Sequence, residues 1–451
     1  MTEQKDLSMH AYFQQLAQHL DTCVAAPLTY TCWFAAEASD FVRFNRGAIR
    51  QAGHVRQQLL TLELIDGQRH AGSTVTMSGD LASDLVLLDQ TVVRLGDLVR
   101  DLPADPHLLL PDAVVSSTRT IASSLPPTAT MVEQILALAA GHDMVGILAC
   151  GPLYRGFANG AGQRNWHETP SFNFDYSLYG QGAGSDKAVK TSYAGQDWDS
   201  AHLQAGFALA IERLALLARP AKRIAPGAYR AYLTPTALGE IISMLNWEGV
   251  SEKSLRSRQS SLRRMRDEGA VFNAAVTLSE NTGAGIAPGF QASGFIKPAQ
   301  VKIIEGGRLT GSMVSPRTSR EYGIAANGAG GGESMASIDM AGGELEMASI
   351  LATLGTGILV SNLWYLNYSD RANCRMTGMT RFATFWVENG EIVAPLEVMR
   401  FDESLYRLLG ENLLGLTRER ELLIDNASYG ARGTDSARLP GALVKDFTFV
   451  L

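Results

Sequence analysis

Apolar and polar positions alternate in the first part of the chain in a pattern that predicts a β-sheet. Leucines alternate with polar residues over 60–64, an Asp-Gly pair stands at 66–67, and β-branched residues follow over 73–77. Alternation on both sides of an Asp-Gly pair predicts a β-hairpin, because such turns need residues that tolerate a positive φ. We expect residues 40–50 to join the same sheet, and residues 144–195, with their glycine-rich turns, to extend it.

A different period, in which apolar residues recur every three or four positions, predicts helices that flank this sheet. The period is clearest between Leu81 and Val99, and Asp80 stands where a side-chain cap of that helix belongs. Five prolines between 103 and 127 indicate an extended connection. Further helices are predicted at 8–22, 128–141, 198–218, 235–246, 252–266, 344–354 and 403–414.

Glycine turns between short apolar runs dominate the second half of the chain. Hairpins are predicted at 301–314 and 382–393, and two prolines within 219–227 mark a boundary ahead of them. A chain of 451 residues exceeds one ordinary core, so two domains are expected. The predicted fold class is α+β: a helix-flanked N-terminal sheet domain (1–220) followed by a β-rich C-terminal domain (221–451).

Composition narrows the class of protein. Apolar residues make up 46 % and charged residues 19 % of the chain, as in a folded globular protein. The net charge of −7 argues against nucleic-acid binding, which needs clustered cations. Six cations within 252–266 are interpreted as a solvated helix face, with docking of an acidic partner as the alternative. No membrane contact and a cytoplasmic location are expected, because no apolar stretch approaches the roughly 20 residues of a membrane helix and no signal peptide is evident.

Four segments of the chain stand out in a fixed order: 232–242, 303–310 followed by 315–323, 354–361, and 385–392. They resemble the TldD/PmbA family, whose members are also called modulators of DNA gyrase. Each segment is short, but their order and spacing match the family. Together with the pattern around residues 40–77, the resemblance covers most of the chain.

The resemblance implies a zinc metallopeptidase fold, in which active members carry His-Glu-x-x-x-His on the helix after the first segment and a cysteine near the C-terminus. The histidines hold zinc and the glutamate serves as general base. Here Ser243 and Glu248 occupy the histidine positions and Met244 that of the base, and residues 426–432 contain no cysteine. All eight histidines lie within the first 202 residues. The chain is therefore placed in the TldE/PmbA-like branch, and we expect no metal, no cofactor and no catalytic residue at these positions.

Two other features have a functional and a structural interpretation. His167-Glu168 looks like the start of a zincin motif, but Ser171 stands where the second histidine is needed, so a strand or loop residue is favoured. Cys374 lies between two arginines, which lower thiol pKa values. A nucleophilic cysteine normally needs a histidine within reach, so a structural thiol is favoured.

Asn327, Gly328 and Gly330 belong to a glycine-rich loop and are our candidates for lining a peptide groove. Glycine lets a backbone approach a ligand closely, although a plain flexible connection is equally compatible with this composition. The spacing matches neither of the two common glycine motifs that bind nucleotides.

We expect a dimer in which this chain, without zinc of its own, supports proteolysis or maturation of unfolded peptides. The partner would be a TldD-like zinc peptidase subunit or a second copy of the chain. Extended peptide would add to an exposed strand edge through backbone hydrogen bonds. Two alternatives stay open: an independent hydrolase that uses Glu240, Glu248 or Cys374, and a non-catalytic homodimeric peptide-binding protein.

Overall fold

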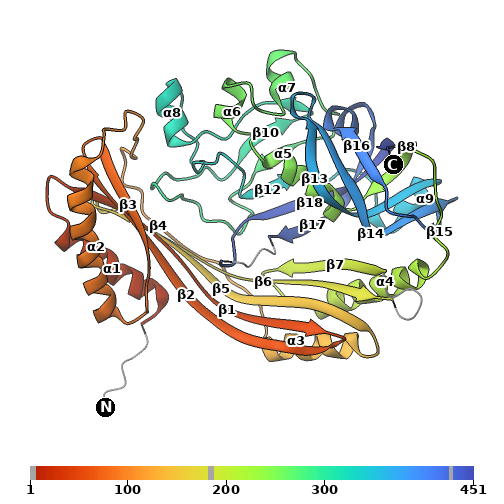
Figure 1. Cartoon of the computed structure of the whole chain (residues 1–451), viewed down its shortest axis with the longest axis horizontal. Coiled ribbons are helices and arrows are strands. Elements are labelled where there is room, and N and C mark those ends of the chain that lie inside the picture. Colours follow the sequence, from red (N-terminus) through yellow and green to blue (C-terminus); the bar gives the residue numbers. More distant parts are fainter. Residues whose placement is uncertain (1–6, 181–186, 426–429, 451) are drawn as a thin grey trace.

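Two β-sheets carry the structure, a computed structural model that describes residues 7–180, 187–425 and 430–450. In Figure 1 the first sheet is a long curved layer, and the second sheet lies across from it. All described strands of the first sheet precede those of the second in the sequence, and helices pack against both. The α+β fold class is confirmed, whereas the division into two domains at residue 220 stays a prediction.

The first sheet has the strand order β3-β2-β1-β5-β6-β4, with β7 beside β6. Its strands are β1 (Thr29–Asn45), β2 (Ala48–Asp66), β3 (Arg69–Thr76), β4 (Ser117–Thr120), β5 (Asp143–Asn159), β6 (Arg164–Tyr179) and β7 (Ala188–Gly195). Arg46 and Gly47 both have a positive φ, as the tight turn between β1 and β2 requires. The predicted hairpin at 66–67 is confirmed, and residues 40–50 join the same sheet as expected.

Helices cover the two ends of this sheet, with α1 and α2 at one end and α3 and α4 at the other (Figure 1). They are α1 (Met9–Cys23), α2 (Leu81–Asp101), α3 (Thr128–Ala139) and α4 (Ser200–Leu217). Asp80 caps α2 as predicted, since its carboxylate accepts a hydrogen bond from the Ser83 amide. The core beneath α1 is aromatic: the Phe13 ring stacks against Phe34 and Trp166, at centroid distances of 5.4 and 5.7 Å.

The second sheet has the order β11-β10-β9-β12-β18-β16-β14-β13-β8, with β15 beside β14 and β17 beside β18. Its strands are β8 (Gly227–Leu233), β9 (Leu278–Glu280), β10 (Val301–Glu305), β11 (Arg308–Leu309), β12 (Ser337–Met340), β13 (Gly357–Asp370), β14 (Arg375–Glu388), β15 (Glu391–Pro395), β16 (Arg400–Ser404), β17 (Leu413–Ile424) and β18 (Ser436–Phe449). Helix α5 (Pro235–Asn246) forms over the predicted residues and packs on β13 and β18. Its buried face consists of Leu238, Ile241, Ile242 and Leu245.

The prediction of one continuous helix over residues 252–266 is wrong. The segment contains two short helices, α6 (Glu252–Arg256) and α7 (Arg263–Asp267). Between them Arg258 adopts a positive φ, which a continuous helix does not allow. The cations therefore share no helix face, and Arg256 and Arg266 both bind the buried carboxylate of Glu252, at 2.6 Å each.

The helices predicted at 344–354 and 403–414 also need correction. The first shortens to a 3-10 turn (Met347–Ser349) followed by α9 (Ile350–Leu354). Residues 403–414 instead form the end of β16, a π-helical turn (Arg407–Glu411) and the start of β17. The chain reverses direction tightly in this segment, and its apolar side chains point into the core of the second sheet. Their spacing in the sequence therefore resembles that of a helix, although no regular helix forms.

The remaining elements are close to expectation. The hairpin at 382–393 is confirmed by β14 and β15, and the one at 301–314 has a second strand of only two residues. A seven-residue helix, α8 (Pro316–Tyr322), was not predicted. Among the described residues, every helix is too short or too polar to span a lipid bilayer.

Gly151 is a position where the first sheet requires glycine. It has a φ of +131°, and a Cβ there would lie 2.2 Å from the Ala38 carbonyl oxygen on β1. Gly151→Ala is expected to lower the free energy of unfolding in urea by about 1–3 kcal/mol, because the neighbouring strand must move. Gly162→Ala is the matched control, since Gly162 also has a positive φ (+90°) but has no atom within 4 Å of its Cβ position. Equal losses for the two variants would contradict the steric argument.

Candidate functional site

A buried arginine joins the C-terminal segment to the first sheet. Arg432 is 4 % exposed, and its guanidinium reaches three strands. It donates hydrogen bonds to Ser39 Oγ on β1 (3.2 Å), to the Gly151 carbonyl on β5 (3.1 Å), and to both the carbonyl and the hydroxyl of Ser171 on β6 (2.8 Å each). Burial lowers the pKa of Arg432 to about 10, while the buried Glu37 carboxylate nearby favours its charged form. The segment around residue 432 is thereby fixed against the first sheet.

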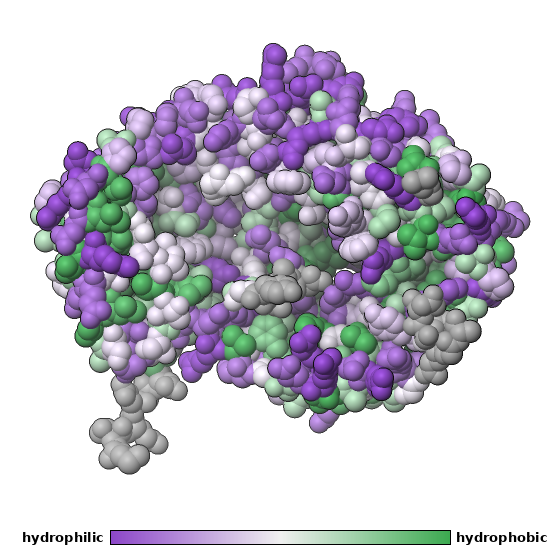
Figure 2. All heavy atoms as spheres, in the orientation of Figure 1, coloured by the Kyte–Doolittle hydropathy of each residue, from purple (hydrophilic) through white to green (hydrophobic). Residues whose placement is uncertain are grey.

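Between the two sheets the molecule is hollowed, and Figure 2 shows this depression on the face in view. A cavity of about 290 Å³ extends along β5, β6 and β7 of the first sheet, where Lys190 lines it, to Phe382 of the second sheet. The pKa of Glu240 on α5 responds to the charge of Lys190, which places this carboxylate at the same junction.

Carboxylates on the second-sheet side of this hollow are both exposed to solvent and desolvated by the surrounding protein, two properties that are rarely found together. Glu240, Glu421 and Asp435 are solvent-exposed, yet desolvation by the surrounding protein raises the pKa of each. A side chain that is open to water and still desolvated lies in a recess with protein on most sides. Each of them also interacts with a cation of the first sheet or its helices (Lys190, Arg213 or Arg155), so all three lie near the junction of the two sheets.

The first-sheet side of the hollow supplies cations. Arg213 on α4 favours the ionised form of Glu421, and Arg155 on β5 does the same for Asp435. Burial lowers the pKa of both arginines. The two walls thus carry opposite charges in an environment where water screens them weakly, so a charged or strongly polar ligand would be bound more tightly there than on an open surface.

His167 lies on β6 and is completely buried, which confirms the strand interpretation of His167-Glu168. Its Nε2 donates to the Ile286 carbonyl at 2.9 Å, so Nδ1 is the unprotonated nitrogen. Nδ1 has no hydrogen-bond partner among the described residues. Burial, with a further contribution from nearby cations, lowers the pKa of His167 to about 4. This histidine joins the two halves of the chain as a neutral donor.

The three positions that the resemblance assigns to a vacated metal motif lie at or just beyond the end of α5. Ser243 is exposed, Met244 is half-buried against the core, and Glu248 lies beyond the end of the helix. Helix α5 stops at Asn246, and Glu248 has a φ of +64°. Residues 243 and 248 therefore do not lie on adjacent turns of one regular helix.

The carboxylate of Glu248 is already engaged. Arg371 binds it at 2.7 Å, and the same guanidinium lies over the rings of Trp247 (4.9 Å) and Tyr368 (4.7 Å). The Tyr368 hydroxyl in turn donates to the Met244 carbonyl at the end of α5. This cluster anchors the helix end to β13.

The glycine-rich loop lies next to α5, because Asn246 exchanges two hydrogen bonds with the backbone of Met335. The Asn327 side chain ties the loop to the segment before α8, because it accepts a hydrogen bond from the amide of residue 314 and donates one to the carbonyl of residue 312. Gly328 is buried against the backbone of residues 296–297, and only Gly330 is exposed with open space around it. Their role in a peptide groove stays a prediction.

Cys374 is completely buried, and burial raises the pKa of its thiol to about 12, as a structural cysteine requires. Of the segment 426–432, residues 426–429 lie outside the described residues. The residues that join or line the hollow (Arg432, Asp435, Glu421 and Arg213) were not singled out from the sequence, because they are isolated charges in separate segments with no motif around them. For Arg432, the sequence shows only an isolated arginine close to the C-terminus, with no motif around it.

Residues 226–450, the C-terminal half of the chain, match the model of the PmbA/TldA metallopeptidase C-terminal domain. The chain belongs to the PmbA/TldD family. No curated protein matches it in sequence.

Solved structures share the fold over nearly the whole length. TldE from Thermococcus kodakarensis is 13 % identical with a TM-score of 0.78, over 98 % of this chain and 100 % of that chain. A candidate modulator of a DNA gyrase from Thermotoga maritima is 12 % identical with a TM-score of 0.74, over 98 % and 100 %. Another, from Bacteroides thetaiotaomicron, is 16 % identical with a TM-score of 0.74, over 97 % and 98 %.

The buried His167 makes stability depend on pH. Its pKa of about 4 in the folded chain lies below the ordinary value of 6.5, so the unfolded chain binds more protons between these pH values. The free energy of unfolding is expected to fall by about 3 kcal/mol on this account as the pH decreases from 6.5 to 4. Urea unfolding of His167→Gln, which keeps a donor for the Ile286 carbonyl, should show a shallower pH dependence. Identical pH profiles for the two proteins would refute the assignment.

Replacing Arg432 tests the connection between the C-terminal segment and the first sheet. Arg432→Met leaves several buried oxygens without their donor and the buried Glu37 carboxylate without its counter-charge, so a loss of about 3–5 kcal/mol in the free energy of unfolding is expected. Arg418→Met is the control, since Arg418 has a 60 % exposed side chain and forms only a surface pair with Glu346, worth about 0–1 kcal/mol. The argument fails if urea unfolding gives similar losses for both.

Proposed function

We propose that this protein is a TldE-like subunit without catalytic zinc, which holds extended peptide in the hollow between its sheets for a TldD-like zinc peptidase. The proposal is supported by the PmbA/TldD family membership together with the substitutions on α5. The main supporting observation is the position of Glu248, which lies beyond the end of α5 and forms an ion pair with Arg371. A hydrolytic role of this chain would need a free base or ligand there.

An open strand edge beside the hollow supports peptide binding. Strand β17 pairs with β18 on one side, and on its other side residues 343–345 bond to its first half only. The second half, residues 419–424, has no strand partner on that side among the described residues, and it includes Glu421. Strand β7 of the first sheet lies close to β17 (Figure 1). An unfolded peptide can add to such an edge through backbone hydrogen bonds without demanding one sequence.

The carboxylates on the second-sheet side of the hollow favour peptides that carry cationic groups. Glu240 and Glu421 are desolvated, so each gains more from a lysine, an arginine or a peptide amino terminus than a carboxylate on an open surface does. A cytoplasmic location is part of the proposal, and the four free cysteines agree with a reducing compartment.

The isolated chain is expected not to cleave an unfolded, lysine-containing peptide, whereas a mixture with a His-Glu-x-x-x-His subunit should cleave it and co-purify as a complex. In that complex Glu421→Gln should raise KM about fivefold, which corresponds to the loss of about 1 kcal/mol from one ion pair. Glu248→Gln is the matched control and should leave KM and kcat unchanged, since this carboxylate is held by Arg371.

The alternatives give different results. Cleavage by the isolated chain that disappears in Glu248→Ala would establish an independent hydrolase and overturn the proposal. A stable homodimer that binds peptide but recruits no His-Glu-x-x-x-His subunit would identify a peptide-binding protein instead.

A further inference from the structure

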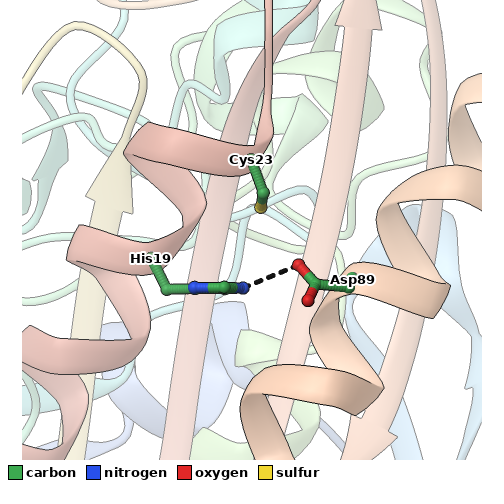
Figure 3. A group of neighbouring side chains, drawn as sticks. All are labelled: His19, Cys23 and Asp89. Carbon is green, nitrogen blue, oxygen red and sulfur yellow. Dashed lines mark hydrogen bonds and ion pairs between the residues drawn. The ribbon is translucent and has the colours of Figure 1, made fainter.

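Three side chains with metal-ligand chemistry converge between α1 and α2, at the end of the first sheet and outside the hollow. Figure 3 shows His19 and Cys23 on the last turns of α1 and Asp89 on α2, with their polar ends directed toward one another. His19 Nε2 lies 2.7 Å from Asp89 Oδ1, and the ligand atoms of all three residues lie within 4.8 Å of one another. In the part of the chain that the structure describes, no second group of three such donors converges.

The helices themselves produce this arrangement. His19 and Cys23 are four positions apart and therefore share one face of α1. The two helices pack together through buried leucines, among them Leu20 and Leu88, which turns the donor face of α1 toward Asp89. The side chains of His19 and Asp89 are 23 % and 52 % exposed, so an ion and a water ligand can reach the group from solvent.

We propose that His19, Cys23 and Asp89 bind a divalent ion of the zinc class, which clamps the last turn of α1 to α2. One imidazole, one thiolate and one carboxylate form a donor set that suits Zn²⁺ or Co²⁺, whereas Mg²⁺ and Ca²⁺ prefer oxygen ligands only. The two negative charges of Cys23 and Asp89 balance the charge of the ion. A water molecule completes a tetrahedral site.

Small side-chain rotations bring the donors to the required spacing. Tetrahedral zinc with bonds of 2.0–2.3 Å holds its ligand atoms about 3.3–3.8 Å apart. The His19–Asp89 distance of 2.7 Å is shorter and the 4.8 Å limit of the group is longer, so the ion separates the first pair and draws Cys23 inward. Burial raises the pKa of Cys23 to about 11, and a bound divalent ion supplies the charge that deprotonates this thiol.

The competing explanation is a plain His–Asp pair between two helices with an unrelated thiol nearby. The chain contains a matched pair of that kind, because His54 Nδ1 lies 2.8 Å from Asp40 Oδ1 in the first sheet. Among the residues that the structure describes, no thiol completes a group of three donors there. His54→Ala therefore removes an equivalent pair without touching the proposed site.

Cobalt titration of the full chain, reduced and stripped with a chelator, tests the proposal. We expect one equivalent of Co²⁺ to bind with a thiolate-to-metal charge-transfer band, and Zn²⁺ to displace it. Cys23→Ser should abolish the band. His19→Ala should weaken binding by at least the roughly 10–100-fold that loss of a supporting residue around a metal causes, and His54→Ala should bind like the wild type.

A second measurement needs no variant that might misfold. Zn²⁺ should protect Cys23 of the wild-type chain from alkylation, as followed by peptide mass spectrometry. The other three cysteines are buried and serve as internal references. Absence of a charge-transfer band, a band that persists in Cys23→Ser, or equal alkylation with and without Zn²⁺ would each overturn the proposal. These outcomes do not involve peptide, so they leave the proposed function of the hollow to its own test.

Discussion

The guanidinium of Arg432 connects the two halves of the molecule. A buried cation costs several kcal/mol unless its charge and its donors are satisfied. Here hydroxyl and carbonyl oxygens of β1, β5 and β6 accept the donors, and Glu37 supplies the counter-charge. Since these acceptors come from three neighbouring strands, the arginine fits only where the first sheet is fully assembled. The position of the C-terminal segment over that sheet, and with it the shape of the hollow, follows from this one contact.

The charges around the hollow are divided between its two sides, and this division determines which ligands it would favour. The second-sheet side contributes desolvated carboxylates, and the first-sheet side contributes half-buried arginines. Mutual attraction across the space stabilises both sets, but it leaves carboxylates such as Glu421 accessible to solvent and ready to bind a cationic group. The end of α5, in contrast, is neutralised by the contact between Glu248 and Arg371. The proposed binding site is therefore the hollow, whereas the positions that correspond to the family's metal motif serve the contacts at the end of α5.

The sequence predicted the features that depend on local patterns. The turn at Asp66-Gly67 and the boundaries of α5 follow from turn chemistry and apolar period, and the resemblance to a family supplied the rest of the fold. The prediction failed where a local pattern has two explanations, as at 403–414, where a tight reversal buries residues at helical spacing. Arg432 was not foreseen because its partners lie more than 250 residues away in the sequence. The His19–Cys23–Asp89 group was missed for the same reason, since its third donor comes from another helix.

A hollow whose walls are tied together selects ligands by their conformation. Arg432 and the His167–Ile286 hydrogen bond both join the first sheet to segments of the C-terminal half, so wide opening would break buried polar contacts. A folded domain does not enter such a space, whereas a single extended chain can run along the open edge of β17 next to β7. Backbone hydrogen bonds do not depend on the peptide's side chains, and the charges around the hollow would add only a mild preference for cationic ones. Under the proposed function, the preference for unfolded peptide would follow from the geometry of the hollow and would require no pocket for a particular residue.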